Sequence, residues 1–253
     1  MFGICNLATV PLRREPNDRS EMVSQVLFGD YFEIIESQKQ WLKIKLYFDG
    51  YEGWIDAKQV KTINAAQYEL VKAALPEFNL DLVAYVADSE NALTAITIGA
   101  AINFLNIDNI NAKKQFFDGL KISGTQEKNS LVQTAYLYLN APYLWGGKTP
   151  FGIDCSGFTQ MVYKINGHFL FRDASQQATQ GDVLSFIEEC EPGDLAFFDN
   201  EDGKIIHVGI ILAQNYIIHA SGKVRIDRLD HSGIYNEETK LHTHRLRLLK
   251  KII

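Results

Sequence analysis

A cysteine at position 155 stands at the junction between a glycine-containing polar segment and a run compatible with a helix. Residues 152–154 (Gly-Ile-Asp) precede it, and a run from Ser156 to Ile165 follows. The first N–H groups of a helix lack intrahelical partners, and the helix dipole places positive potential at that end. Both effects favour the thiolate, which is the nucleophilic form of cysteine. We therefore interpret Cys155 as a reactive thiol.

Two of the six histidines lie in apolar, strand-like segments and offer a base for this thiol. His207 lies within the run 205–210 and His219 within 217–220, where the neighbours are mainly aliphatic. A single histidine in such a run is usually a core residue. A pair on adjacent strands, together with a cysteine that begins a helix, favours nucleophilic catalysis.

The spacing between the two histidines predicts a particular hairpin. If the strands form an antiparallel hairpin centred on Ala213, His207 and His219 face each other and both rings project from one face of the sheet. A two-residue turn at 214–215 would instead pair His207 with Gly222 and place His219 on the opposite face. The catalytic interpretation therefore requires a loop with an odd number of residues.

General cysteine-hydrolase chemistry assigns each of these groups a role. His207 deprotonates Cys155 and later protonates the leaving amine. His219 hydrogen-bonds the far ring nitrogen of His207 and fixes its tautomer. The backbone N–H of Cys155, at the helix start, stabilises the oxyanion. The three side chains together predict acyl chemistry that proceeds through a thioester.

The elements that position these groups lie in the C-terminal half of the chain. Helical spacing over 131–139 ends at Pro142, and a second helix spans about 156–165. Strand-like segments follow at 194–198, 205–212, 216–220, 224–229 and 244–249. Helices that precede an antiparallel sheet predict an α+β domain.

The first 62 residues have short strands separated by turns, which is typical of a small barrel. They resemble a bacterial SH3 (SH3b) domain at 6–16 (Asn-Leu-Ala-Thr-Val-Pro-Leu-Arg-Arg-Glu-Pro), at a Gly-Asp turn, at 41–45 and at 53–56. Residues 63–125 begin with a helical pattern over 65–75, which Pro76 stops. Strand-like segments at 82–86, 94–98, 101–105 and 119–123 then predict a second, degenerate SH3-like domain.

Composition and charge exclude several classes of protein. The formal net charge of -6 at pH 7 argues against a nucleic-acid partner, which needs a basic face. The three cysteines are too few and odd in number for a disulfide framework, so we interpret Cys5 and Cys190 as small buried residues. The apolar stretch 92–105 is too short to span a bilayer, and the N-terminus lacks the pattern of an export signal. We expect a cytoplasmic protein without a membrane partner.

Five motifs of the chain resemble the NlpC/P60 peptidases. They are 154–158 (Asp-Cys-Ser-Gly-Phe), 207–210 (His-Val-Gly-Ile), 219–221 (His-Ala-Ser), 142–147 (Pro-Tyr-Leu-Trp-Gly-Gly) and 172–177 (Arg-Asp-Ala-Ser-Gln-Gln). The resemblance covers about 126–250, behind the SH3b segment. It implies a papain-like catalytic domain over 126–253, preceded by SH3-like barrels over 1–62 and 63–125. The third polar residue of the family's triad is often a histidine, in agreement with His219.

Within this family the chain is most similar to the γ-D-glutamyl-L-diamino acid endopeptidases with N-terminal SH3b domains. The resemblance implies hydrolysis of the bond between γ-D-glutamate and meso-diaminopimelate or lysine, in cell-wall stem peptides with a free L-alanine amine. The sequence leaves the choice of diamino acid and the oligomeric state open. With no export signal in the sequence, the implied role is recycling of imported muropeptides.

The resemblance also implies a set of substrate-binding residues. An ammonium group in a pocket needs an anion, which Asp154 supplies with help from Asp173, while Tyr143 and Trp145 form the pocket walls. The other implied contacts are Ser156, Ser175, Glu52 and Tyr85.

Several of these residues have a structural alternative that the sequence leaves open. Asp154 and Asp173 each precede a helix-compatible run and are suited to helix capping. Trp145 is suited to anchoring its loop in the core, and Glu52 and Tyr85 to exposed positions on the barrels.

Two other functions remain open for the whole chain. One is a non-catalytic, SH3b-type wall-binding protein, and the other is an acyltransferase in which an amine or alcohol resolves the thioester. Neither requires a cofactor. A metal site is not expected, because the pair His242 and His244 has no third ligand nearby in the sequence.

Overall fold

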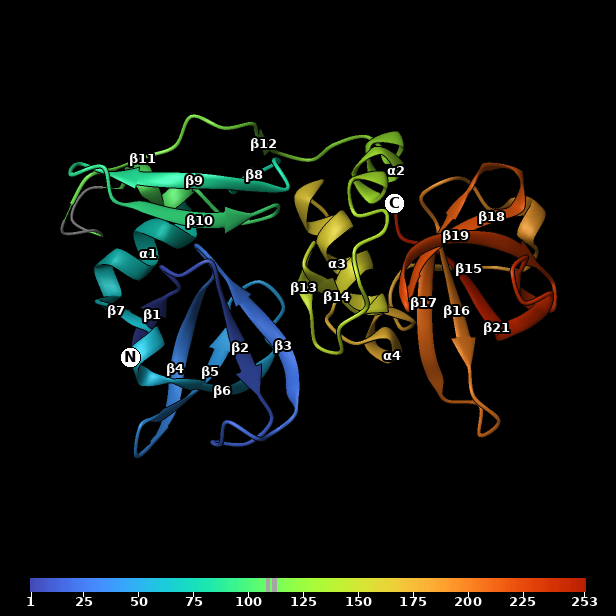
Figure 1. Ribbon diagram of the computed structural model, residues 1–253, viewed down its shortest axis with the longest axis horizontal. Coiled ribbons are helices and arrows are strands. Elements are labelled where there is room, and N and C mark those ends of the chain that lie inside the picture. The colour runs from blue at the N-terminus through green and yellow to red at the C-terminus, as the bar shows by residue number, and fades with distance from the viewer. Residues whose placement is uncertain (108–109, 111–112) are drawn as a thin grey trace. The chain divides into compact units, whose positions relative to one another are not determined.

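The computed structural model describes residues 1–107, 110 and 113–253, and the chain divides into two compact units between Thr125 and Gln126 (Figure 1). We call Met1–Thr125 unit 1 and Gln126–Ile253 unit 2. Residues 108, 109, 111 and 112, which belong to the predicted domain 63–125, lie outside the described residues.

Unit 1 begins with a strongly bent antiparallel sheet whose strand order is β3-β2-β6-β5-β4-β1-β7. Burial alternates along β2, and Leu12, Phe32 and Ile44 are fully buried in the core of the sheet. This confirms the predicted SH3-like region. The strands are β1 (Phe2–Ile4), β2 (Thr9–Arg13), β3 (Met22–Leu27), β4 (Tyr31–Gln38), β5 (Trp41–Leu46), β6 (Glu52–Asp56) and β7 (Lys61–Ile63).

The rest of unit 1 contains α1 (Ala65–Ala73) and five short strands. The helix begins with a capping box between Asn64 and Gln67, and Pro76 follows its end. Two small sheets have the orders β10-β9-β11 and β12-β8. Their strands are β8 (Glu77–Asn79), β9 (Val83–Asp88), β10 (Leu93–Thr97), β11 (Gln115–Phe116) and β12 (Lys121–Ser123).

One predicted strand of unit 1 is wrong. The segment 101–105 contains a short 3₁₀ helix, η2 (Asn103–Asn106), instead of a strand. Phe104 of this helix is fully buried in a core that also contains Ile4 and Phe28 from the first sheet and Ile96 from β10. An apolar run is buried in either conformation, so the pattern alone did not distinguish them. Because this core joins both parts of unit 1, a domain border at residue 62 stays a prediction.

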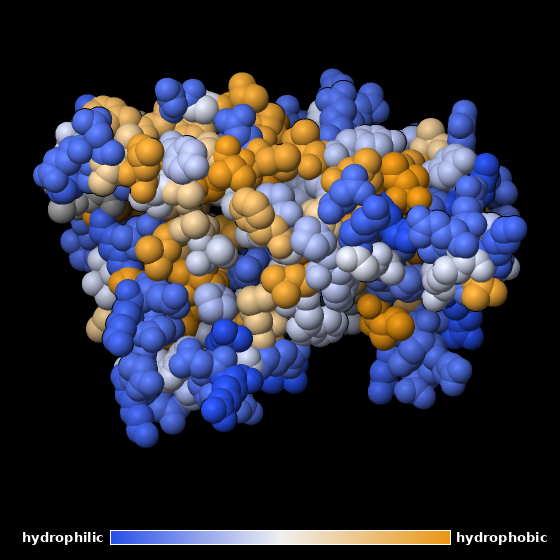
Figure 2. Space-filling model, viewed as in Figure 1, coloured by the Kyte–Doolittle hydropathy of each residue, from blue (hydrophilic) through white to orange (hydrophobic). Residues whose placement is uncertain are grey.

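Unit 2 is an α+β domain, and the predicted fold class is confirmed. Its sheet has the order β15-β21-β16-β17-β18-β19-β20, and β20 also pairs with β21, so six strands close into a ring. The exposed turn 200–204 between β16 and β17 forms a hydrophilic projection (Figure 2). The strands are β15 (Asp182–Leu184), β16 (Leu195–Asp199), β17 (Ile205–Leu212), β18 (Tyr216–Ser221), β19 (Lys223–Asp230), β20 (Gly233–Asn236) and β21 (Leu241–Lys251).

Three helices and a two-stranded ribbon accompany this sheet. They are α2 (Lys128–Leu137), α3 (Cys155–Ile165), α4 (Ala174–Gln177), β13 (Lys148–Thr149) and β14 (Gly152–Ile153). The central helix α3 is buried along its whole length and packs against β17 and β18. A helix that is buried on all sides holds its first residue in a fixed position relative to the sheet. In the described parts of the chain, no helix has the length and apolar character needed to cross a membrane.

Candidate active site

Cys155 is the first residue of α3 and lies against strand β17. Asp154 is the N-cap and accepts a 2.6 Å hydrogen bond from the N–H of Gly157. The Cys155 sulfur is hydrogen-bonded by the backbone N–H of Val208 and of Ser156. Since Val208 directly follows His207, these contacts place the sulfur beside the predicted base.

Burial dominates the acidity of this thiol. It raises the pKa of Cys155 to about 12, the Asp154 carboxylate adds to the rise, and the Val208 N–H and the Arg172 guanidinium oppose it. The expectation that the helix start alone favours the thiolate is therefore outweighed by desolvation. In the resting site the proton lies on the sulfur, so the nucleophile needs a base at the moment of attack.

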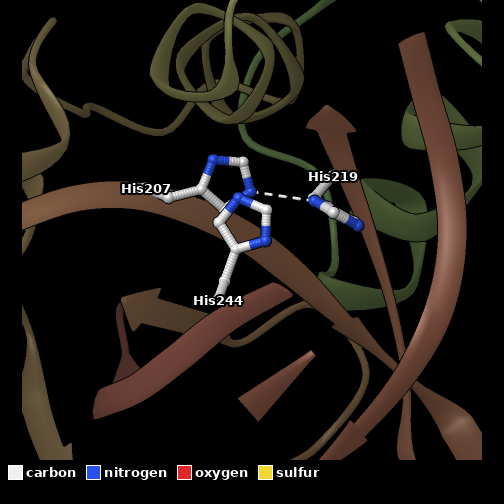
Figure 3. A group of neighbouring side chains, drawn as sticks. All are labelled: His207, His219 and His244. Atoms are coloured by element: carbon white, nitrogen blue, oxygen red, sulfur yellow. Dashed lines mark hydrogen bonds between the residues drawn. The ribbon is translucent and has the colours of Figure 1, made fainter. Parts of the chain in front are cut away.

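His207 and His219 are in direct contact. His207 Nε2 and His219 Nδ1 lie 2.8 Å apart and share a hydrogen bond (Figure 3). The rings are almost perpendicular, with an interplanar angle of 86°, and both residues are buried. Burial lowers the pKa of His207 well below its usual value, and the neighbouring rings of His219 and His244 add to this shift. The ring of His207 is therefore neutral near pH 7 and able to accept a proton.

The hairpin that carries the two histidines has an odd-length loop, as the catalytic interpretation required. Strands β17 and β18 are joined by the three residues of η4 (Ala213–Asn215). However, the predicted direct pairing of His207 with His219 is wrong, because His219 faces Gly209. A register shift of two residues preserves the side-chain face, so both rings still project from the same side.

Because Gly209 has no side chain, His219 on the neighbouring strand can pack directly against it. A Cβ atom at position 209 would lie 2.8 Å from the Cβ of His219 and 2.7 Å from Cδ1 of Ile217, closer than side chains pack. A residue with a side chain at this position would therefore push the histidine strand away.

Asp227 and Arg225 of β19, which were not among the predicted site residues, extend the histidine pair. His219 Nε2 lies 3.0 Å from Asp227 Oδ2. Arg225 donates to both Asp227 oxygens, from Nε to Oδ2 at 2.7 Å and from Nη2 to Oδ1 at 2.9 Å. The one sequence signal was an Arg and an Asp two residues apart in an apolar strand, which places both on one face.

His244 of β21 is a third histidine at this site. Its ring stacks on that of His207, with centroids 4.1 Å apart and an interplanar angle of 27° (Figure 3). Burial lowers the pKa of His244 to about 4. No local sequence pattern indicated this contact, because β21 is distant along the chain and comes near β17 only through its pairing with β16.

The three histidines raise the question of a metal site. Within the described part of the chain, one nitrogen from each of His207, His219 and His244 can be chosen so that all lie within 4.8 Å of one another. A metal ion lies in the plane of each imidazole that binds it, and the stacked rings of His207 and His244 direct their lone pairs along nearly parallel planes. The arrangement therefore suits ring stacking better than coordination, and the absence of a metal stays a prediction.

Asp154 has the contacts of a helix cap and of a buried ion pair. Arg172 donates to Asp154 from Nη1 to Oδ1 at 3.0 Å and from Nη2 to Oδ2 at 2.6 Å. The N–H of Gly146 donates to Oδ2 at 2.8 Å. Arg172 also donates to the hydroxyl of Ser156 at 3.0 Å. The structure thus gives Asp154 its alternative, capping role, and its contact with a substrate stays a prediction.

Tyr143 and Trp145 lie in the loop before β13. Burial raises the pKa of Tyr143 to about 12, and the acidic groups of Cys155 and Asp154 add to the rise. Trp145 is 59% exposed, which does not fit an anchor within the core. Both positions are compatible with pocket walls, and that role stays a prediction.

The remaining predicted substrate residues are spread over both units. Asp173 immediately precedes α4, and Gln176 accepts a 3.1 Å hydrogen bond from its N–H, as in a helix cap. Ser175 is exposed within α4. In unit 1, Glu52 pairs with Lys43 at 3.1 Å, and Tyr85 on β9 is 56% exposed. Substrate contacts of these four residues stay predictions.

Comparison with known proteins identifies both parts of the chain. The sequence pattern of the NlpC/P60 family matches residues 140–243, which include Cys155, His207 and His219. Unit 2 is an NlpC/P60 domain. The pattern described as the bacterial dipeptidyl-peptidase SH3 domain matches residues 12–60. The predicted resemblance is confirmed, and the chain is a cysteine peptidase of the NlpC/P60 type.

Named relatives match most of the chain. The gamma-D-glutamyl-L-lysine dipeptidyl-peptidase of Bacillus subtilis (strain 168) is 27% identical over 78% of this chain and 71% of its own. The dipeptidyl-peptidase 6 of Lysinibacillus sphaericus is 29% identical over 87% of this chain and 88% of its own. The crystal structure of an NlpC/P60 family protein from Bacillus cereus ATCC 10987 has 19% identity and a TM-score of 0.84, and covers 100% of this chain and 99% of that chain. It supports the fold.

Proposed function

We propose that this NlpC/P60 peptidase hydrolyses the bond between γ-D-glutamate and a diamino acid in cell-wall stem peptides with a free N-terminal L-alanine. Cys155 is the nucleophile, His207 the general base and acid, and His219 the residue that orients His207. The 2.8 Å contact between His207 and His219, next to a sulfur held by the N–H of Val208, is the observation that carries the proposal. The names of the two relatives support the substrate class.

The proposed reaction begins with a neutral pair, because the pKa of Cys155 is raised and that of His207 is lowered. His207 accepts the thiol proton as the sulfur attacks the γ-carbonyl carbon of D-glutamate. The backbone N–H of Cys155 stabilises the oxyanion. His207 then protonates the leaving amine of the diamino acid, which leaves a thioester. Water, deprotonated by His207, cleaves the thioester and releases the dipeptide with a free γ-carboxylate.

Recognition of the free amine is proposed to involve Asp154 and Asp173 near the nucleophile. Both oxygens of Asp154 already accept hydrogen bonds from Arg172 and backbone N–H groups, so the carboxylate has little remaining capacity. Asp154 therefore acts on the ammonium mainly through its charge, and Asp173 is the proposed direct partner. Tyr143 and Trp145 form the walls of this pocket, and Ser156 and Ser175 contribute hydroxyl groups.

A substrate panel tests the proposal. The wild type is incubated with L-Ala-γ-D-Glu-diaminopimelate and L-Ala-γ-D-Glu-L-Lys, each with a free or an acetylated alanine amine, and the fragments are identified by mass spectrometry. We expect a free diamino acid from the unblocked peptides, a strong loss with the acetylated ones, and no product with Cys155→Ala. Hydrolysis that persists in Cys155→Ala, or cleavage at another bond, would contradict the proposal.

The same panel separates the two alternative functions. If an added amine acceptor appears in the product in preference to water, the protein is an acyltransferase on the same scaffold. If the wild type and Cys155→Ala bind the peptides equally and neither forms product, the protein is a wall-binding module.

The proposed setting is recycling of muropeptides in the cytoplasm. Cys5, Cys155 and Cys190 are all free thiols in the described structure, which suits a reducing compartment. Cell fractionation with antibodies against the native protein tests this setting, and recovery of the protein outside the cytoplasm would contradict it.

A further inference from the structure

We propose that Asp227, held by Arg225, is a positioning residue that sets the tautomer of His219 and thereby determines which ring nitrogen of His207 accepts a proton. The inference rests on the proposed catalysis by Cys155 and His207. It adds two residues of β19 to a system that otherwise ends at His219.

The contacts form an unbroken chain through the buried side of the sheet. His207 Nε2 meets His219 Nδ1 at 2.8 Å, and His219 Nε2 meets Asp227 Oδ2 at 3.0 Å. His219 is 1% exposed and Asp227 is 5% exposed. In such a dry setting an imidazole that lacks a partner for one of its nitrogens is costly, so the hydrogen-bond roles along the chain are strongly constrained.

The donor and acceptor roles follow from the carboxylate. An ionised Asp227 can only accept, so His219 must carry its proton on Nε2. The Nδ1 of a neutral His219 then has a lone pair and can only accept, so His207 must donate from Nε2. The Nδ1 of His207 is left with its lone pair and is the nitrogen that accepts the thiol proton. Its position in the ring points away from His219 (Figure 3).

Arg225 helps to keep Asp227 ionised and His219 neutral. Burial opposes ionisation of Asp227, but hydrogen bonds from His219 and Arg225 outweigh it and hold the pKa of Asp227 below its usual value. Burial also lowers the pKa of His219, and the positive charge of Arg225 adds to that shift against the opposing effect of Asp227. His219 therefore stays neutral, so the proton taken from Cys155 remains on His207, from where it can reach the leaving group.

A purely structural ion pair is the alternative explanation. Arg225 and Asp227 are two residues apart on one face of β19, and such a pair needs no further partner. Here the oxygen that accepts from Arg225 Nε is also the oxygen that meets His219. Among the described residues, the charged and titratable groups around His219 include His207 on β17, Asp227 and Arg225 on β19 and His244 on β21, and Glu238 contacts Arg225.

The decisive substitution is Asp227→Asn, which preserves shape and reverses hydrogen-bond polarity. The amide NH₂ can donate to His219 Nε2, which moves the proton of His219 to Nδ1 and that of His207 to Nδ1, so no lone pair faces the thiol. We expect kcat to fall by about 100-fold with KM little changed. The rate at which iodoacetamide alkylates Cys155 should fall in parallel. Asp194→Asn, which removes another buried carboxylate of unit 2 that pairs with Lys128, is the matched control and should retain activity.

The tautomer itself can be measured in the wild type. Nitrogen-15 NMR of the histidine rings should show His219 protonated on Nε2, and Asp227→Asn should reverse this. A wild-type His219 protonated on Nδ1 overturns the inference even if Asp227→Asn does not fold. So does an Asp227→Asn enzyme whose kcat and alkylation rate stay within about threefold of the wild type.

The outcome also separates this inference from the proposed function. An active wild type with inactive Cys155→Ala and unaffected Asp227→Asn leaves the peptidase proposal intact and removes only the role of Asp227. Peptide hydrolysis that survives in Cys155→Ala removes the catalytic proposal, whatever Asp227 does.

Discussion

Two Asp–Arg pairs, each with a buried carboxylate, flank the catalytic region of unit 2, and they serve different purposes. Asp154 and Arg172 lie at the start of α3, where the carboxylate also accepts from the N–H groups of Gly146 and Gly157. Asp227 and Arg225 lie on β19, where the carboxylate also meets an imidazole. The first pair therefore holds the backbone at the start of α3 in place, and the second sets which ring nitrogen of His219 carries a proton. An Asp–Arg pair can therefore hold the backbone of a site or control the protonation of its side chains, depending on the third group that the carboxylate contacts.

The largest expected difference between the pairs is in stability. The Arg172 side chain is 1% exposed and that of Arg225 is 17% exposed. Arg172→Met leaves a buried carboxylate without its ion partner, which should cost about 3–5 kcal/mol of unfolding free energy. Arg225→Met leaves a carboxylate that still meets His219, and should cost about 1–3 kcal/mol. Urea unfolding of both variants measures this, and equal losses would show that the two pairs do not differ in this way.

Two glycines give a second comparison, of intermediate size. A Cβ at position 157 would lie 2.3 Å from the carbonyl oxygen of Gly147 and 2.9 Å from Asp154 Oδ1. The three atoms nearest to a Cβ at position 209 all belong to the side chains of His219 and Ile217. Gly157→Ala should therefore destabilise unit 2 by about 1–3 kcal/mol or more, because backbone must move.

Gly209→Ala should instead lower kcat more than it lowers stability, since the neighbour that must yield carries His219. Thermal unfolding and kcat measured on both variants test this contrast. A Gly209→Ala enzyme with normal kcat would show that the position of His219 has little influence on turnover.

The smallest expected effect concerns pH. The pKa values of His207, His219 and His244 all lie below the ordinary value in the folded protein, that of His244 at about 4. Between about pH 6.5 and pH 4 the unfolded chain therefore binds more protons at these positions than the folded one. Stability is fully present above that window and is lost as pH falls through it. Urea unfolding at pH 7, 5.5 and 4.5 should show a shallower decline for His244→Phe, which keeps the ring stack and removes one titrating group.

The contrast between the two pairs also explains what the sequence could reveal. Cys155, the helix behind it and the strand 205–212 were predictable, because each depends on residues that are neighbours along the chain. Asp154 was expected to contact either the substrate or the helix start, and the geometry shows the capping contacts. The capping contact of Asp154 joins it to Gly157, three residues later, and local sequence patterns are informative at such short spacings.

The parts that were missed depend on pairing over long distances. The stack of His244 on His207 depends on β21 pairing with β16, which places β21 two strands from β17 although the two are far apart in sequence. The contact of Asp227 with His219 requires the register of β18 and β19. The predicted centre of the β17–β18 hairpin was wrong by one residue. Gln214 and Asn215 both adopt left-handed backbone conformations, which are usually signalled by glycine and were therefore not predictable here.

Ring closure also limits how a peptide can be held. Across residues 126–253, all of which are described, the topology of the large sheet leaves only β15 with a single neighbouring strand. No whole strand edge next to the histidines is therefore free for an added strand, as it is where a ligand extends an exposed sheet edge. The proposed substrate would not bind in that way in any case, because its γ-linkage and D-residue interrupt the regular backbone repeat that strand addition needs. Inhibitors built as extended β-strand mimics should therefore be poor starting points, and compact ones that copy side-chain and terminal groups should be better.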